Sequence, residues 1–148
     1  MTKEVTILVA DDDDGHARLI EKNLARGGLH NPIRRFENGQ QVIDFFFEKG
    51  DGPKRQQDTA YLLLLDIRMP RVDGVEVLRQ LKQARTLRKV PVVMLTTTDD
   101  PREVERCHEL GCNSYIVKPV DYDKFADAIK NLGLFISLVE VPGSPGAR

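Results

Sequence analysis

Five short apolar runs are spaced along the chain, and each is followed by a segment with helical periodicity. A short continuous apolar run between polar residues is typical of a strand buried in a parallel sheet. The run at residues 31–36 mixes polar and apolar positions, which indicates a strand at an edge of the sheet. The predicted strands are residues 5–10, 31–36, 61–66, 91–96 and 114–118.

The segments between these runs carry apolar residues three or four positions apart, which predicts helices with one buried face each. Ala17, Ile20 and Leu24 mark the first helix. Asn38, Asp100 and Asp121 stand where side-chain oxygens cap the second, fourth and fifth helices. The helices are predicted over residues 15–26, about 38–49, 75–81 and onward from residues 101 and 122.

Strand and helix alternate five times, which predicts an α/β fold of the (βα)5 type with helices on both faces of a parallel sheet. Residues 50–58 (GDGPKRQQD) form the one polar connection long enough to be an insertion. Ligands of such sheets bind outside the carboxyl ends of the strands. The residues that follow each strand are therefore the candidate functional residues.

Charged and polar residues stand at four of these strand ends. Residues 11–14 are four aspartates after the first strand, Asp66 follows the third, Thr96 ends the fourth and Lys118 ends the fifth. Each alone has an ordinary explanation, such as a helix cap, a surface lysine or a satisfied hydroxyl. Together, carboxylates from adjacent strands repel unless a cation neutralises them, and Mg2+ suits one or two carboxylates plus phosphate oxygens. With an ammonium and a hydroxyl beside it, such a site suits phosphoryl transfer.

Length and charge limit the other classes of function. The chain has 148 residues, which fits one domain, and its 22 Lys+Arg against 23 Asp+Glu argue against a nucleic-acid binder. No apolar run is long enough to span a membrane, and the N-terminus does not resemble a signal peptide. Cys107 and Cys112 do not form a disulfide framework or a complete metal site, and free thiols indicate a cytoplasmic protein.

Over residues 4–133 the chain resembles the receiver domain of two-component response regulators. The matching motifs are the acid pair after ILVA, LLLLDIRMPRVDG around Asp66, PVVMLT ending in Thr96, and SYIVKP ending in Lys118 and Pro119. The resemblance implies a flavodoxin-like, doubly wound sheet with the strand order 2-1-3-4-5. It divides the chain into a receiver domain (residues 1–133) and an apolar C-terminal extension (residues 134–148).

The resemblance also implies the roles of the site residues. Asp66 becomes an aspartyl phosphate, and Mg2+ is held by Asp11, Asp12, Asp66 and the main-chain carbonyl of Arg68. Lys118 pairs with the phosphoryl group, while Thr96 moves to donate a hydrogen bond to it. Tyr115 matches an aromatic residue that follows the movement of the threonine, and Pro119 matches a proline whose preceding peptide bond is cis. The protein is then a phosphoacceptor that assists its own reactions rather than an enzyme with a separate substrate.

The insertion at residues 50–58 and the tail NLGLFISLVEVP are most similar to single-domain regulators that serve bacterial phytochromes, which implies a phytochrome-type sensor histidine kinase as partner. The tail is apolar on all sides, which predicts an interface. We expect a homodimer through the fourth helix, fifth strand, fifth helix and this arm, with output by protein contact or onward phosphate transfer. The arm comprises Leu134, Phe135, Ile136, Leu138 and Val139.

Two alternatives compete with this interpretation. A haloacid-dehalogenase-type phosphatase would use the Asp12-x-Asp14 motif at the first strand end, but it leaves Asp66 unexplained. A pseudo-receiver would keep the fold as an interaction module and never be phosphorylated.

Overall fold

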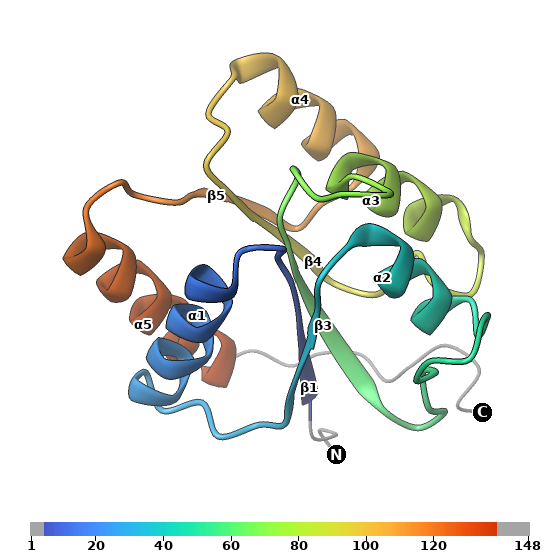
Figure 1. Ribbon diagram of the computed structural model, residues 1–148, viewed down its shortest axis with the longest axis horizontal. Coiled ribbons are helices and arrows are strands. Elements are labelled where there is room, and N and C mark those ends of the chain that lie inside the picture. Colours follow the sequence, from blue (N-terminus) through green and yellow to red (C-terminus); the bar gives the residue numbers. More distant parts are fainter. Residues whose placement is uncertain (1–4, 139–148) are drawn as a thin grey trace.

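The computed structural model describes residues 5–138, in which five strands alternate with five helices (Figure 1). Each strand and helix predicted from the hydrophobic pattern is present, with small shifts at the ends. The predicted caps Asn38, Asp100 and Asp121 each accept a hydrogen bond from a backbone amide in the first helical turn. In chain order the elements are β1 (Val5–Ala10), α1 (Asp14–Arg26), β2 (Ile33–Phe36), α2 (Gly39–Phe46), β3 (Ala60–Leu65), α3 (Gly74–Gln83), β4 (Val92–Thr96), α4 (Pro101–Leu110), β5 (Ser114–Val117) and α5 (Tyr122–Leu138).

The strands form one parallel sheet in the order β2-β1-β3-β4-β5, which confirms the predicted fold class. The pairing register between neighbouring strands determines which of the polar residues after the strands lie side by side. Ala10 of β1 lies opposite Leu65 of β3, so the residues that follow them, Asp11 and Asp66, leave the sheet side by side. Thr96 lies opposite Val117, and Lys118 therefore emerges at the same edge.

The core has two halves, one on each face of the sheet. Alternate side chains of β3 point to opposite faces, so Leu63 packs with α2 and α3 while Leu64 packs with α1 and α5. Figure 1 shows α1 and α5 together on one face and α2, α3 and α4 on the other. Burial on both faces explains why β3 is continuously apolar, since each fully buried leucine contributes about 1.5–3 kcal/mol.

Helix α5 continues past the predicted end of the receiver domain. Its backbone is helical through Leu138, and Gly133 lies inside the helix rather than at its end. A Cβ atom on Gly133 would lie 2.9 Å from the carbonyl oxygen of Leu24, so this glycine permits a close approach between α5 and α1. The division after residue 133 stays a prediction, as does the dimer arm. The side chains of Leu134, Phe135, Ile136 and Leu138, and the whole of Val139, lie outside the described part of the chain.

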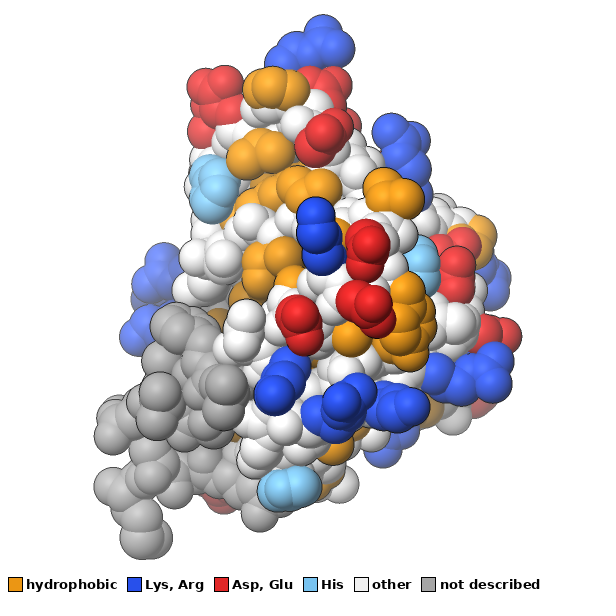
Figure 2. Space-filling model, turned by 90° about the vertical axis from the view of Figure 1, so that its left-hand side faces the viewer, with side chains coloured by type: hydrophobic (Ala, Val, Ile, Leu, Met, Phe, Trp, Pro, Cys, Tyr) orange, Lys and Arg blue, Asp and Glu red, His pale blue; other side chains and the backbone are white. Residues whose placement is uncertain are grey.

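The side of the molecule that carries α5, with α4 above it, has small groups of acidic and of basic side chains next to one another (Figure 2). Neither sign of charge covers this face, in keeping with the balance of 22 basic and 23 acidic residues. Among residues 5–138, no helix has the length and apolar character needed to cross a membrane.

Candidate functional site

Three carboxylates meet at the carboxyl edge of the sheet. Asp11 and Asp12 follow β1 and Asp66 follows β3, and one oxygen from each lies within 4.8 Å of the others. The two strand ends are joined by a hydrogen bond from the Asp66 amide to the Ala10 carbonyl, at 3.0 Å. Asp11 and Asp66 are buried and Asp12 is exposed, so the cluster opens to solvent on the Asp12 side.

Lys118 brings a buried positive charge to this cluster. Its side chain is 1% exposed, and its Nζ donates to Asp11 Oδ2 at 2.5 Å and to Asp66 Oδ2 at 3.4 Å. The chain reaches this position from β5, the strand on the far side of β4 from β3. The ammonium group therefore compensates the two buried carboxylates, whose burial without a counter-charge is costly.

Burial and neighbouring charges shift the pKa of Asp11 in opposite directions. Burial raises the pKa of Asp11, and the hydrogen bond and charge of Lys118 together with the amide of Asp13 lower it in opposition. The negative charge of Asp66 raises the pKa of Asp11 further. Carboxylate oxygens at this spacing, one of them exposed, fit a hard divalent cation that prefers oxygen ligands and keeps several waters.

Two residues that the sequence analysis did not single out also contact the site. His16, in the first turn of α1, places its Nδ1 3.1 Å from the Nζ of Lys118. Arg35 of β2 donates from Nε and Nη2 to the main-chain oxygen of Asp11, at 3.2 and 2.8 Å, and its Nη1 pairs with Asp14. Arg35 thereby holds the loop that carries Asp11 and Asp12 against the edge strand.

The predicted switch residues lie beside the acid cluster. Thr96 is fully buried at the end of β4, and the Thr98 amide lies 3.4 Å from its hydroxyl oxygen. Tyr115 donates from its hydroxyl to the Thr98 carbonyl at 2.7 Å, and burial raises the pKa of this phenol to about 12. Arg68 reaches the Thr98 hydroxyl through its Nε at 3.4 Å. The β4–α4 loop is thus held by one side chain of the β3–α3 loop and one of β5.

The predicted cis bond before Pro119 is absent. Residues 5–138 contain no cis peptide bond, so the Lys118–Pro119 bond is trans and the expectation is wrong for this structure. The trans form of an X–Pro bond is favoured by about 0.5–1 kcal/mol, and surrounding contacts must oppose that preference to select cis. Here Lys118 contacts Asp11 and Asp66 with the bond in its preferred form.

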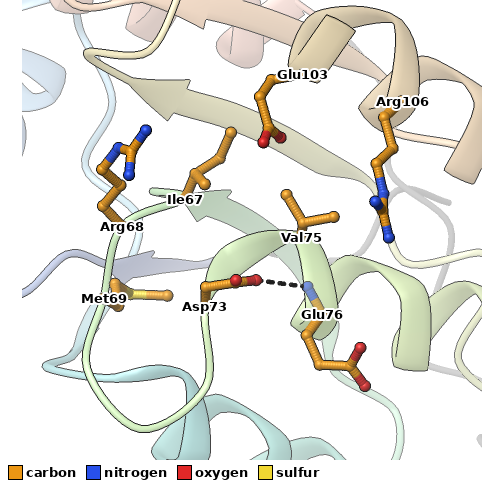
Figure 3. A pocket seen from close by; sticks show the side chains of 8 residues that line it. All are labelled: Ile67, Arg68, Met69, Asp73, Val75, Glu76, Glu103 and Arg106. Carbon is orange, nitrogen blue, oxygen red and sulfur yellow. Dashed lines mark hydrogen bonds between the residues drawn. The ribbon is translucent and has the colours of Figure 1, made fainter.

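A pocket of about 510 Å3 lies beside the site, between the β3–α3 loop and α4. Figure 3 shows Glu103 and Arg106 projecting from α4 toward the β3–α3 loop and the first turn of α3. Among the described residues, Glu103 Oε2 is a buried oxygen without a hydrogen-bond partner. The lining of the pocket includes Arg68 but none of Asp11, Asp66 or Lys118, so the pocket adjoins the acid cluster without containing it.

Comparison with known proteins finds similarity to response regulator receiver domains in both sequence and structure. Residues 7–130 match the family profile of the response regulator receiver domain. A receiver domain from Rhodospirillum rubrum, known from a crystal structure, is 45% identical with a TM-score of 0.89, and the match covers 95% of this chain and 99% of that chain.

Two further response regulators are similar. Rcp1, whose crystal structure was determined in a Mn(2+)-bound form, is 26% identical with a TM-score of 0.83, covering 93% of this chain and 99% of that chain. By sequence, Rcp1 from Synechocystis is 30% identical over 112 residues, which is 76% of this chain and 75% of Rcp1. The bacteriophytochrome response regulator RtBRR is 35% identical with a TM-score of 0.73, covering 99% of this chain and 86% of that chain.

Proposed function

Because this chain belongs to the response regulator receiver family, we propose that Asp66 accepts a phosphoryl group from a sensor histidine kinase in a reaction that requires Mg2+. The observation that carries the proposal is the placement of the Lys118 ammonium between Asp11 and Asp66, with the Asp12 carboxylate open to solvent. Phosphoryl transfer needs alignment and neutralisation of charge more than covalent assistance from the protein, and this edge supplies both.

In the proposed reaction a carboxylate oxygen of Asp66 attacks the phosphorus atom of a phosphohistidine. The new P–O bond forms as the P–N bond breaks and its electron pair goes to the donor nitrogen. The donor ring carries a proton on its other nitrogen and therefore leaves as neutral imidazole. The main-chain amide of Ile67 donates to Asp66 Oδ1 at 2.8 Å and leaves Oδ2, the oxygen that faces Lys118, as the attacking atom. Bound Mg2+ would supply positive charge to the phosphoryl oxygens, and the donors proposed for it are Asp11, Asp12, Asp66 and the Arg68 carbonyl.

The conformational response would begin at Thr96 and Tyr115. The Thr96 hydroxyl lies at the end of the strand next to β3, from which it would move to donate to the phosphoryl group. That movement would draw in the β4–α4 loop, to which Tyr115 is bound through the Thr98 carbonyl. The signal would then leave through a rearranged α4 that contacts another protein, or through transfer of the phosphoryl group to another protein. In the phosphorylation reaction the protein acts as its own substrate.

The proposed kinase is a bacteriophytochrome, and the similarity to RtBRR supports this choice. Purified candidate histidine kinases, labelled on histidine, are incubated with this protein, and transfer of label is followed over time. Preferred transfer from a phytochrome kinase is the expected result. Efficient transfer from another kinase, with none from the phytochrome kinase, would contradict this narrower proposal. The free buried thiols Cys107 and Cys112 support a cytoplasmic setting for the pair.

The proposed homodimer uses α4, β5, α5 and the arm at residues 134–148. Analytical ultracentrifugation of the full chain should show a dimer. A variant in which Leu134 and Phe135 are both replaced by serine should sediment as a monomer. A dimer of unchanged stability in that variant would remove the arm from the interface.

Phosphorylation itself is tested by binding of beryllofluoride, a phosphoryl mimic. The intact protein should bind it only with Mg2+ present, and Asp66→Ala should not bind it. Absence of binding by the intact protein would favour the pseudo-receiver alternative. Mapping the modified residue after treatment with acetyl phosphate separates Asp66 from Asp12, the residue that a haloacid-dehalogenase-type phosphatase would modify.

A further inference from the structure

The buried ammonium group of Lys118 has three hydrogen-bond partners of two different kinds. Two are the carboxylates of Asp11 and Asp66, at 2.5 and 3.4 Å, and the third is the Nδ1 atom of His16, at 3.1 Å. An ammonium group has three N–H donors, so these three acceptors account for all of them. His16 is the one partner that carries no negative charge and does not stand at a strand end.

One contact holds the backbone of His16 and another holds its ring. Its amide donates to Asp13 Oδ1 at 2.9 Å in the cap of α1. Its ring meets the buried ring of Phe125 edge-on, with centroids 5.5 Å apart and an angle of 73° between the planes. Because the ammonium group can only donate, a hydrogen bond between the two side chains requires Nδ1 to be the acceptor and the ring proton to be on Nε2. The same Nδ1 lies 3.9 Å from Asp13 Oδ2, so its nearest charged neighbours are the Lys118 ammonium and this carboxylate.

The two carboxylate partners of Lys118 are the groups that the proposed reaction uses. Asp11 and Asp66 would both turn toward a bound cation, and Asp66 Oδ2 would become the bridging oxygen of the acyl phosphate. The hydrogen bond to His16 does not compete with either event. It is the contact that can hold the ammonium group in place while its other two partners change.

We propose that His16 is a positioning residue for Lys118, an inference that rests on the function proposed above. The His16 imidazole keeps the lysine ammonium directed toward Asp66 Oδ2 as the phosphoryl group arrives. Lysine has a flexible four-carbon stem, and fixing its head in advance lowers the cost of ordering it around the phosphoryl oxygens. The expected contribution is to binding of the phosphoryl group and not to binding of the metal.

Two substitutions separate the acceptor atom from the bulk of the ring. His16→Phe keeps an aromatic edge against Phe125 and removes the acceptor, whereas His16→Asn places an amide oxygen where Nδ1 stood. At saturating Mg2+, the dissociation constant for beryllofluoride should rise about tenfold in His16→Phe, equivalent to ~1.4 kcal/mol. His16→Asn should restore most of the affinity, and His30→Phe, at an exposed histidine, should leave it unchanged.

Binding of Mg2+ alone, measured by calorimetry, shows whether the effect is specific. Equal losses of Mg2+ and beryllofluoride affinity in His16→Phe would mean a general disturbance of the site and would overturn the proposal. Failure of His16→Asn to restore binding would also overturn it, because the acceptor would then not matter. With acetyl phosphate as donor, the limiting rate of phosphorylation should fall in His16→Phe while the half-saturating donor concentration stays the same.

The outcomes also separate this inference from the proposed function. If the unaltered protein fails to bind beryllofluoride, the receiver chemistry fails and His16 has nothing to position. If the unaltered protein binds it and His16→Phe binds it equally well, only the role of His16 is refuted. Thermal unfolding of each variant confirms that the fold is retained.

Discussion

Lys118 is the buried cation between the Asp11 and Asp66 carboxylates, so its removal should cost stability in a way that a metal ion can reverse. Lys118→Met keeps an unbranched side chain of similar length and removes the charge. Breaking a buried ion pair by deleting one partner costs about 3–5 kcal/mol. Burial raises the pKa of Asp11, and without Lys118 this carboxyl protonates more readily, which limits the cost. We therefore expect a loss near the lower end of that range, about 3 kcal/mol.

Urea unfolding at neutral pH, in EDTA and in excess Mg2+, measures this loss. In EDTA the variant should unfold at a clearly lower urea concentration than the unaltered protein. In Mg2+ most of the difference should disappear, because the metal supplies the missing positive charge, and a ligand at a hundred times its dissociation constant stabilises by ~2.7 kcal/mol. The matched control is Lys22→Met, at an exposed lysine of α1, which should change neither curve.

Two results would refute this reasoning. If Lys118→Met unfolds with the unaltered protein in EDTA, the ammonium group is not what compensates Asp11 and Asp66. If Mg2+ stabilises the variant no more than it stabilises the unaltered protein, lysine and metal are not interchangeable as counter-charges at this edge.

Three further predictions concern other parts of the site. Gly74→Ala should lower the free energy of unfolding by about 1–3 kcal/mol, because the new Cβ would lie 2.0 Å from the Asp66 carbonyl oxygen. The control is Gly52→Ala, where a Cβ meets nothing within 4 Å, and equal urea midpoints for the two variants would contradict the prediction. Asp12→Asn should raise the urea midpoint in EDTA, because it relieves the repulsion among the three carboxylates, and it should abolish stabilisation by Mg2+. If Mg2+ still stabilises this variant, Asp12 is not a metal ligand. Burial raises the pKa of the Tyr115 phenol to about 12, so its stabilising effect is complete below the ordinary phenol pKa of ~10 and is lost as the pH rises toward 12. An ultraviolet titration of Tyr115→Phe should lack the highest step, and an unchanged curve would show that this phenol is not the perturbed one.

The strand ends could be predicted from sequence because each depends on a strong local pattern. The continuous apolar run before Asp66 places it at the carboxyl edge of the sheet, and the strand order implied by the family resemblance places it beside Asp11. Thr96 and Lys118 follow by the same argument, since they end the next two strands of the sheet. Their chemical roles came from the family resemblance and stay predictions.

His16 and Arg35 could not be predicted, because neither follows a pattern that hydrophobic periodicity detects. His16 is one polar residue in the first turn of a helix, and its contact with Lys118 joins residues 102 positions apart. Arg35 made its strand look irregular, and the irregularity was the available signal that this side chain has a partner. The cis bond before Pro119 was expected from the family resemblance alone, and the structure has a trans bond there.

Helix α4 is attached to the sheet through a single fully buried side chain, Cys107, and the strand beside it, β5, has no fully buried residue. Few buried contacts mean a low free energy of local opening, so the amides of this region should exchange with solvent deuterium well before those of β1 and β3. The acid cluster thus follows β1 and β3, whose side chains are almost all buried, and lies next to β5 and α4, which have few buried side chains. A covalent change at Asp66 would need only a small part of the molecule's stability to displace α4, while the chemistry itself stays on a rigid base.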